Sequence, residues 1–329
     1  TQIAALTAAQ LGAITATKLA GLADTQVAAF TTTQVAALST SQLAAFNATN
    51  LSALDATQVA ALSATQVRAL TVTQLNALQA ADIGEFTETQ IAGMTTTQVR
   101  GFDETSLGAL GDTQVASLTA TQLQAMLAAN VSAFTDTQIA ALSNAQVAAF
   151  NATQIGALDA ADIGEFSATQ IAAMTTTQIR AFDATKLAAL DEAQVAAMTA
   201  TQLASITATN VAAFTETQMA ALTITQMAAF TAAQIAAFED ADFAALDASQ
   251  VAALSTTQAR AVTATQIGAL AANDLAEFTE TQLAAMTTTQ VAAFTATNVA
   301  SLADTQIAAL TATQIAKLGA EAVAAFDAA

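Results

Sequence analysis

Residues 55–62 read Asp-Ala-Thr-Gln-Val-Ala-Ala-Leu, and Ser63 begins the same pattern again. Counted from Thr1, the 329-residue chain is 41 octads with one residue left over, and the Asp55 frame runs through it without a break. The first octad residue is Thr, Ser, Asp or Asn in 33 of the 41 repeats, and the fourth is Gln in 29. Such strict periodicity indicates a repeat architecture in which each octad is one structural unit.

The octad has the features of a helix start. Asp55 is a suitable N-cap, because its carboxylate can accept hydrogen bonds from the free backbone N–H groups of a first helical turn. Gln58, three residues later, can reach back to the N–H of the cap and complete a capping box. Leu54 and Val59 take the two positions of a hydrophobic staple. The sequence therefore predicts a new helix in every octad.

Two other structures compete with this prediction. In one long helix, an octad exceeds two turns (about 7.2 residues), so the apolar stripe would drift by roughly 80° per repeat and face no single partner. A β-solenoid is the stronger rival, because Thr, Val and Ile favour strands. However, Val59 and Leu62 are three residues apart, which places them on one face of a helix but on opposite faces of a strand. We expect an all-α solenoid of about 41 short helices, with a β-solenoid as the alternative.

Longer periods bear on the packing of these helices. Six Phe residues, from Phe86 to Phe326, recur at intervals of six octads. From Phe86 onward nearly every Phe at the last octad position falls in every second octad; Phe238 is the exception. Alternate octads are thus predicted to differ, one roomy and one tight, in layers of two octads. A three-sided coil with three octads per turn also fits the six-octad interval and stays open.

The domain organisation follows from the same regularity. No linker or change of composition interrupts the repeats. We therefore expect one continuous domain over residues 1–329, a segment or subunit of a longer array.

Composition excludes several functions. The chain has no His, Cys, Trp, Tyr or Pro, which removes the commonest general base, thiolate chemistry and most aromatic platforms for stacking nucleobases. Its net charge is −19, from 26 acidic and 7 basic residues. A surface this acidic would repel nucleic acid and anionic membranes. No apolar run approaches the roughly 20 residues of a membrane span, so we expect neither nucleic-acid binding nor membrane insertion.

The acidic residues have a structural explanation. Eighteen of the 26 lie at the cap or the residue after it, and five of the seven basic residues fall later in the octad, as the helix dipole favours. A Ca²⁺ site at Glu239, Asp240 and Asp242, or at Asp82, Glu85 and Glu88, is the functional alternative.

Carboxylate pairs for acid/base catalysis can be imagined at Asp82 and Glu85, and again at Asp162 and Glu165. Their recurrence suggests a repeated surface feature. We therefore predict that the protein is not an enzyme and has no catalytic, cofactor-binding or metal-binding residues.

Threonine pairs recur along the chain, as at Thr31 and Thr33 or Thr175 and Thr177. A flat Thr ladder could bind ice. The simpler interpretation is that the first Thr is a helix cap and the second lies in the first helical turn. The many Thr and Ser residues are also candidate O-glycan acceptors if the protein is extracellular.

The repeat Leu-Thr-x-Thr-Gln-Val-Ala-Ala-Leu, seen with minor changes from Leu70 to Leu78, resembles the octapeptide arrays of very large bacterial exported, adhesin-like surface proteins. The resemblance covers the whole chain. It implies an extracellular or cell-surface location and a stalk or fibre role, and it carries no catalytic residues.

We expect a non-enzymatic structural protein, an extracellular filament or adhesin stalk. Both ends of the sequence are ordinary octads without polar capping repeats, which favours a longer parent chain or head-to-tail assembly of copies. The alternatives are a binding scaffold, with its patch in the irregular stretch Ala271 to Phe278, and an ice-binding protein.

Overall fold

A computed structural model describes residues 2–271 and 273–327. Within these ranges every regular element is helical: 39 α-helices of four to six residues and three 3-10 helices, with no strand. The all-α solenoid prediction is confirmed for this part of the chain, and the β-solenoid alternative is wrong. No helix of the described residues is both long enough and apolar enough to cross a membrane.

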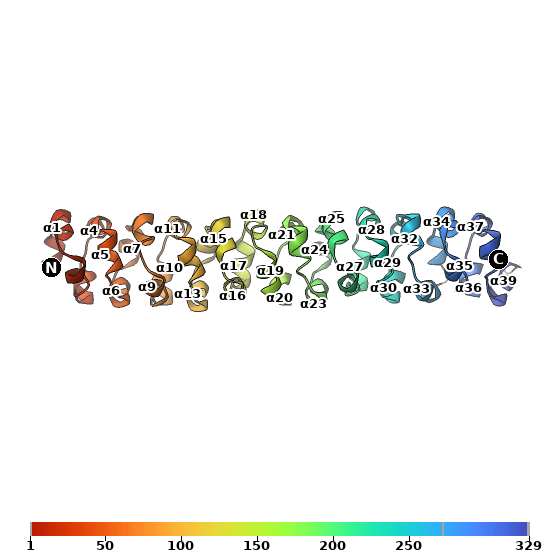
Figure 1. Cartoon of the computed structure of the whole chain (residues 1–329), viewed down its shortest axis with the longest axis horizontal. Coiled ribbons are helices and arrows are strands. Elements are labelled where there is room, and N and C mark those ends of the chain that lie inside the picture. Colours follow the sequence, from red (N-terminus) through yellow and green to blue (C-terminus); the bar gives the residue numbers. More distant parts are fainter. Residues whose placement is uncertain (1, 272, 328–329) are drawn as a thin grey trace. The chain divides into compact units, whose positions relative to one another are not determined.

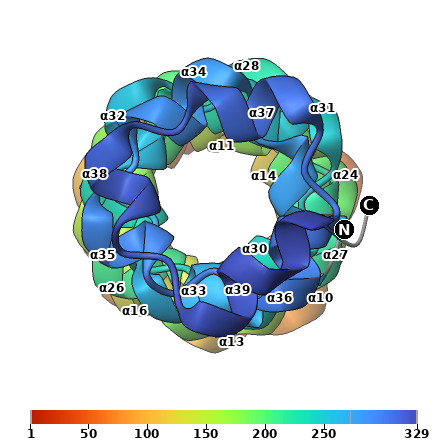
Figure 2. The ribbon, with the colours of Figure 1, turned by 90° about the vertical axis from the view of Figure 1, so that its right-hand side faces the viewer.

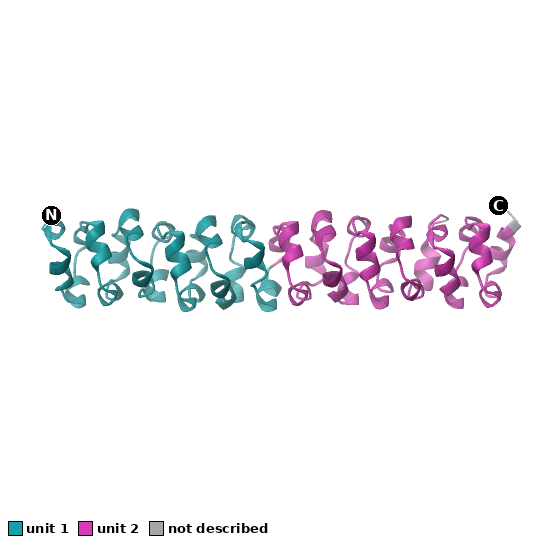
Figure 3. Ribbon diagram, turned by 90° about the horizontal axis from the view of Figure 1, so that it is seen from above, with its two compact units in different colours: residues 1–158 teal, residues 159–329 magenta. Residues whose placement is uncertain are grey.

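The chain divides into two compact units, residues 1–158 and 159–329 (Figure 3). The elements of unit 1 are η1 (Ile3–Ala5), α1 (Ala8–Gly12), α2 (Ala16–Leu19), α3 (Asp24–Val27), α4 (Thr32–Ala37), α5 (Thr40–Ala44), α6 (Ala48–Ser52), α7 (Ala56–Ala60), α8 (Ala64–Val67), α9 (Val72–Asn76), α10 (Ala80–Gly84), α11 (Glu88–Gly93), α12 (Thr96–Arg100), α13 (Glu104–Gly108), α14 (Asp112–Ala116), α15 (Ala120–Ala125), α16 (Ala128–Val131), α17 (Asp136–Ala141), α18 (Asn144–Val147) and α19 (Ala152–Ala157).

The elements of unit 2 are α20 (Ala160–Gly164), α21 (Ala168–Ala173), α22 (Thr176–Ile179), α23 (Ala184–Ala188), α24 (Glu192–Ala197), α25 (Ala200–Ser205), α26 (Ala208–Val211), α27 (Glu216–Ala220), α28 (Ile224–Ala229), α29 (Ala232–Ile235), α30 (Asp240–Ala244), α31 (Ala248–Ala252), α32 (Thr256–Ala259), α33 (Ala264–Ala269), η2 (Leu275–Glu277), α34 (Glu280–Ala285), α35 (Thr288–Val291), α36 (Ala296–Ala300), α37 (Asp304–Ala309), α38 (Ala312–Ile315), α39 (Ala320–Ala324) and η3 (Ala325–Asp327).

Most helices start as the sequence predicts. Before α7, Asp55 has extended backbone (φ −83°, ψ 168°), its Oδ1 accepts from the Gln58 N–H at 2.9 Å, and its own N–H donates to Gln58 Oε1 at 2.8 Å. The same box, with Thr, Ser or Asn as the cap, precedes most other helices. Helices such as α4 end on an extended residue, here Leu38, and Ser39, the next cap, is extended too. Two consecutive extended residues therefore turn the chain into the next helix.

Within each unit the helices form a coil in which a helix packs on the one three octads later. In unit 1, α1 contacts α4 (Figure 1) and α2 contacts α5; in unit 2, α20 contacts α23 and α23 contacts α26. The predicted layer of two octads is therefore wrong, and the three-sided coil is closer. Viewed from the C-terminal end of unit 2, α34, α35, α36 and α37 follow one another counter-clockwise as the chain approaches the viewer (Figure 2). The coil of unit 2 is thus right-handed.

The glutamine side chain joins successive turns of the coil. Gln154 is 1% exposed, and its Oε1 accepts from the N–H of its cap, Asn151, at 2.8 Å. Its Nε2 donates to the carbonyl oxygens of Leu123 at 2.7 Å and Met126 at 2.9 Å, 31 and 28 residues earlier. These carbonyls lie at the end of α15: that of Leu123 also accepts from the Met126 N–H at 3.2 Å, and that of Met126 lies beyond the last helical turn. One turn of the coil therefore takes between three and four octads. The Gln side chain forms hydrogen bonds through both its amide oxygen and its amide nitrogen.

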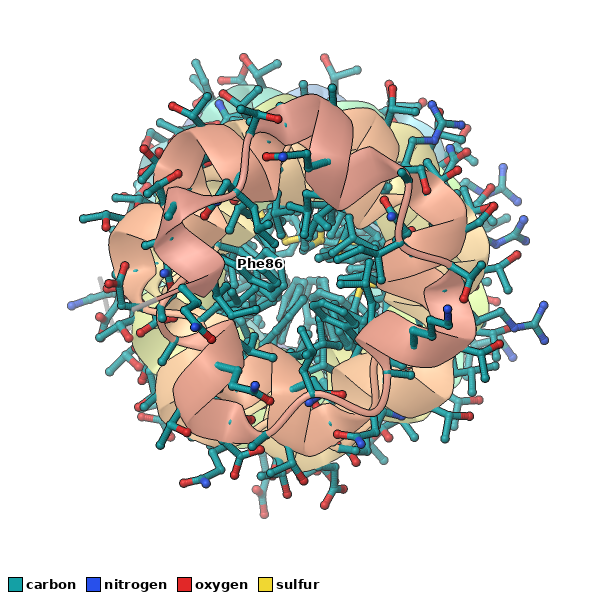
Figure 4. The ribbon with its side chains drawn as sticks, turned by 90° about the vertical axis from the view of Figure 1, so that its left-hand side faces the viewer. Phe86 is labelled. Atoms are coloured by element: carbon teal, nitrogen blue, oxygen red, sulfur yellow. The ribbon has the colours of Figure 1, made fainter. Side chains whose placement is uncertain are left out.

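The two apolar octad positions form the core. Val59 and Leu62 are 5% and 4% exposed, and the equivalent residues of almost every octad are buried. Figure 4 looks along the coil from the N-terminal side; Phe86 points into its interior, and oxygen- and nitrogen-tipped side chains project outward. Helices this short are unstable alone, so the stability of each unit comes from this shared core and from the Gln bonds.

The alternation of Phe has a packing reason. Stacked octads are three apart, an odd number, so a Phe in every second octad lies over an octad that ends in a smaller residue; the exception is Phe238, three octads after Phe214. Phe86, after α10, shares a small apolar cavity with Leu62, which ends the octad three before it. The octad three after it, which contains α13, packs on α10 and ends in Leu110. Large and small side chains thus alternate along the axis, as dense packing requires.

Candidate functional site

Twelve octads depart from Gln at the fourth position, and their spacing follows the coil. Consecutive members are three or four octads apart, which is one per turn. Within each unit they therefore fall along one side. They are Lys18, Asn50, Asp82, Ser106 and Asn130 in unit 1, and Asp162, Lys186, Asn210, Asp242, Asp274, Asn298 and Ala322 in unit 2.

These replacements weaken the bonds between turns on that side. Asn is one methylene shorter than Gln, and Asn130 and Asn210 each donate to one carbonyl 28 residues earlier, Phe102 at 2.8 Å and Phe182 at 2.9 Å. An ionised Asp has no N–H to donate. Asp82 instead accepts from the Ser52 hydroxyl of the preceding turn at 2.6 Å.

The acidic residues recur at the same interval along the chain. In the sequence they form twelve groups; neighbours within a group are no more than one octad apart, and successive groups are separated by nearly two octads or more. There is again one group per turn, so within each unit the acids share one side. We call this set the acidic column. Its described side chains are Asp24, Asp55, Asp82, Glu85, Glu88, Asp103, Glu104, Asp112 and Asp136 in unit 1, and Asp159, Asp162, Glu165, Asp183, Asp191, Glu192, Glu216, Glu239, Asp240, Asp242, Asp247, Asp274, Glu277, Glu280, Asp304 and Glu321 in unit 2.

Carboxylates on neighbouring turns of the column interact electrostatically. Burial raises the pKa of Asp242 to about 6, and the charges of Glu239 and of Glu216, on the preceding turn, contribute to this rise. Burial also raises the pKa of Glu85, with smaller contributions from Asp82 and from Asp55 on the preceding turn. Carboxylates at these two places are therefore stacked on successive turns of the coil.

Glu277 repeats this environment in unit 2. Its pKa is raised by burial, then by Asp274 and by Asp247 on the preceding turn. One oxygen of Glu277, and likewise one of Glu85, is buried and has no hydrogen-bond partner among the described residues. Other column members are held in place as caps: hydrogen bonds from the Thr57 hydroxyl and the Gln58 N–H lower the pKa of Asp55.

Shallow grooves between turns of the coil are lined in part by acidic side chains of the column. One of about 510 Å³ is lined by Phe214, Glu216, Glu239 and Asp242 among others. Two further grooves, of about 370 and 460 Å³, contain Glu85 with Glu88 and Glu277 with Glu280. All three lie where one helix ends and the next begins, so they are openings of the same repeated junction.

Six basic side chains are exposed, and five of them lie outside the acidic column; the sixth, Lys18, is at a fourth octad position. Arg68 and Arg100 in unit 1 are four octads apart. In unit 2, Arg180 and Arg260 are ten octads apart, and Lys317 follows a little over seven octads after Arg260. These intervals are close to one, three and two turns of the coil. We call these five side chains the basic row.

Lys186 differs from the basic row, because it lies among the acids. Its Nζ is 3.0 Å from Asp183 Oδ2, and this is the sole ion pair in the described part of the chain. Hydrogen bonds from the backbone and the side chain of Lys186 lower the pKa of Asp183. One carboxylate of the column is therefore neutralised within its own chain.

Another groove lies beside the basic row in unit 1. It has a volume of about 920 Å³ and spans three successive turns, with Arg100, Leu127 and Thr153 among its lining residues and no acidic side chain. Leu127 occupies a cap position and is 46% exposed. Leu127 has no side-chain oxygen to cap α16. This octad therefore has an exposed apolar side chain at the position where most octads have a capping residue.

The described structure does not bring the acidic triads and threonine pairs suggested by the sequence together into one site. Among the described residues no three His, Cys, Asp or Glu side chains converge as metal ligands would, so neither acidic triad gains support as a Ca²⁺ site. Thr31 and Thr175 are helix caps that accept from Gln34 and Gln178 N–H at 3.2 Å. Thr33 and Thr177 lie within the helices that follow.

Comparison with known proteins gives a repeat family. The model of the ALTTAQ repeat matches residues 35–72, in unit 1, and 235–272, in unit 2. The two matches cover less than a quarter of the chain, and they are consistent with a repeat protein. No curated protein sequence matches the chain.

The two charged faces were not predicted from the sequence. An octad count gives only the position of each acid within its repeat, and most acids are then at or next to the cap. Their alignment on one side of the coil does not appear, because one turn is not a whole number of octads. The signal that could have revealed the column is the interval of three or four octads between fourth positions without Gln. The matches at Asp82, Asp162 and Asp242, ten octads apart, are a part of the same series.

Proposed function

We propose that this chain is a non-enzymatic structural protein that serves as a filament or adhesin stalk outside the cell. The observation that carries the proposal is that each turn repeats one set of contacts. Gln90 donates to the carbonyls of Val59 and Leu62 at 2.7 Å each, and Gln314 makes the equivalent bonds to Leu283 and Met286 at 2.9 Å. A coil built this way can be lengthened by any number of octads, as a stalk requires.

Head-to-tail assembly follows from the same contact set. Every turn presents donor Nε2 groups on one side along the axis and acceptor carbonyls on the other. Two copies can therefore continue the bonding that joins successive turns within one chain, and such a heterologous contact makes open filaments. The resemblance to bacterial exported, adhesin-like arrays supports an extracellular or cell-surface location.

Cryo-electron microscopy of the purified chain tests the proposal. We expect unbranched fibres whose axial repeat is that of stacked short helices. Particles that remain one chain long at every concentration would move the function toward a spacer or a binding scaffold. A thermal-hysteresis measurement would separately test ice binding, which the use of Thr31 and Thr175 as caps disfavours.

A scaffold role is the second candidate. Its proposed patch, residues 271–278, keeps its core residues Leu275 and Phe278 at 0% and 1% exposed, and residue 272 lies outside the described residues. The 460 Å³ groove with Glu277 opens there. A pull-down with the chain as bait, compared with one carrying Glu277→Ala, would test this role.

A further inference from the structure

We propose that copies of this chain associate side by side, with the basic row of one copy against the acidic column of a second. The inference deepens the proposed structural role and rests on it, since it concerns how stalks or filaments bundle. It starts from the separation of the two charges within each unit.

The basic row has no ionic partner in the described part of its own chain. Arg68 lies midway in sequence between Asp55 and Asp82, which is about half a turn from both. Arg260 has the same relation to Asp247 and Asp274. Half a turn places a side chain across the coil from these acids.

The other three members of the row lie close to acids in sequence, and Lys317 precedes Glu321 by four residues. Arg100 and Arg180 each precede an acidic cap, Asp103 or Asp183, by three residues. Neither guanidinium group forms an ion pair within the described residues, and the Asp183 carboxylate is engaged by Lys186 instead. The exposed guanidinium groups are therefore available to a second molecule.

Counter-charges are few along the acidic column in the described part of the chain. Asp242 has another carboxylate, Glu216, as its neighbour on the preceding turn, and Lys186 is engaged by Asp183 at 3.0 Å. A face with stacked like charges is stabilised by any cation brought to it. The chain's own basic row is a set of cations spaced by nearly whole turns.

The spacing of the two faces makes them complementary. Within each unit both patterns repeat with the turn of the coil, so two units from different copies laid side by side meet at two or three points in one register. An exposed ion pair contributes little alone, and several in register are needed for a specific contact. The groove beside Arg100 adds an apolar element, because a neighbour docked there would cover the exposed Leu127 side chain.

The net charge of −19 sets the salt range in which pairing occurs. At about 0.02 M salt the screening length exceeds about 20 Å, so the overall repulsion between two acidic copies dominates. At about 0.15 M it is near 8 Å, and only the facing charges count. At about 1 M those are screened as well. Side-by-side association is therefore expected to be strongest at intermediate salt.

Sedimentation velocity and cryo-electron microscopy of the full chain at these three salt concentrations test the inference. The test variant is Arg68→Gln with Arg100→Gln. The matched control is Lys18→Glu, which lowers the net charge by the same two units at an exposed site outside the basic row. We expect paired particles for the unaltered chain and the control at about 0.15 M, and association at least about tenfold weaker for the test variant.

The outcomes separate this inference from the proposed function. Fibres that stay single at every salt concentration overturn side-by-side pairing and leave the filament intact. Pairs that form without fibres support the pairing and count against head-to-tail assembly. Equal weakening in the test and control variants overturns the assignment to the basic row, as does pairing that persists unchanged at about 1 M salt. Circular dichroism confirms that each variant remains helical.

Discussion

Gln122 and Met94 lie on successive turns of unit 1, and the Gln122 Nε2 donates to the Met94 carbonyl oxygen over 2.9 Å. The same nitrogen donates to Ile91 at 2.9 Å, and Gln122 Oε1 accepts from the Thr119 N–H at 2.7 Å. One side chain thus closes the start of its own helix and the end of a helix one turn earlier. Local capping and coil stacking are therefore coupled in a single residue type.

Replacing Gln122 by Ala should strongly destabilise its region of the coil. The change removes the partners of the Met94 carbonyl and the Thr119 N–H, while the Ile91 carbonyl keeps its bond from the Met94 N–H at 3.1 Å. We expect a cost of about 1–3 kcal/mol in the free energy of unfolding. Gln124 lies in the same helix, α15, and is exposed, so Gln124→Ala is the matched control and should change stability by less than about 0.5 kcal/mol. Hydrogen exchange of the Thr119 amide should accelerate in the first variant alone; equal effects would refute the role of the Gln bonds.

Gly101 marks a close approach between turns. A Cβ built there would lie 2.6 Å from Val72 Cγ1 and 2.8 Å from its Cγ2, whereas one at Gly108 would meet nothing within 4 Å. We expect Gly101→Ala to lower the melting temperature, with a cost of about 1–3 kcal/mol. Gly108→Ala lies inside α13 and should stabilise by about 0.5–1 kcal/mol. Thermal melts of both variants give the comparison, and a Gly101→Ala chain as stable as the unaltered one would contradict it.

The local structure could be predicted because it depends on neighbours in sequence. Asp55 and Gln58 are three residues apart, and the box they form needs no information about the rest of the chain. The burial of Val59 and Leu62 follows from their positions on one helix face. Every octad repeats these facts, so the all-helical solenoid was accessible from one octad.

The turn of the coil could not be predicted in this way. It depends on the angle that two extended residues, such as Leu38 and Ser39, impose between helices, and a small change in that angle per octad decides whether two, three or four octads complete a turn. The partners of the Gln Nε2 groups and the two charged faces depend on that number. With a predicted layer of two octads, neither the partners of the Gln side chains nor the two charged faces could be predicted.

Phe238 and Val262 provide a test of packing between turns. Phe238 breaks the alternation, lies in edge contact with Phe230 at 5.2 Å between ring centroids, and precedes Val262 by three octads. Val262 is the sole Val at the last octad position, and its helix, α32, packs on α29. The smaller residue thus offsets the larger one on the adjacent turn.

A double-mutant cycle measures this compensation. Phe238→Leu should cost about 1–3 kcal/mol by leaving a cavity, and Val262→Leu about 1–3 kcal/mol by overpacking. The double variant restores the alternation, so its loss should be smaller than the sum of the two by at least about 1 kcal/mol. Denaturant unfolding of the four chains gives the coupling, and simple additivity would show that the two side chains are independent.

Asp242 makes the stability of unit 2 depend on pH. Its pKa is raised to about 6 by burial and by Glu239 and Glu216, so the folded chain binds a proton more tightly than the unfolded chain does. Stability from this group is complete below the unfolded pKa, near 4, and is lost as the pH rises through about 6. We expect a decrease of about 1–2 kcal/mol, less than the full shift would give because water reaches the groove.

Asp242→Gln should remove this dependence and raise stability at neutral pH. Gln at this position can accept from the Glu239 N–H and donate to the carbonyls of Val211 and Phe214, as Gln234 does to those of Leu203 and Ile206 at 2.8 Å each. Asp240→Gln removes the same charge from an exposed site on the same helix and should leave the pH dependence in place. Melting curves between about pH 4 and 7 decide the matter. If the Asp242→Gln chain loses stability with rising pH as the unaltered chain does, another carboxylate of the column is responsible.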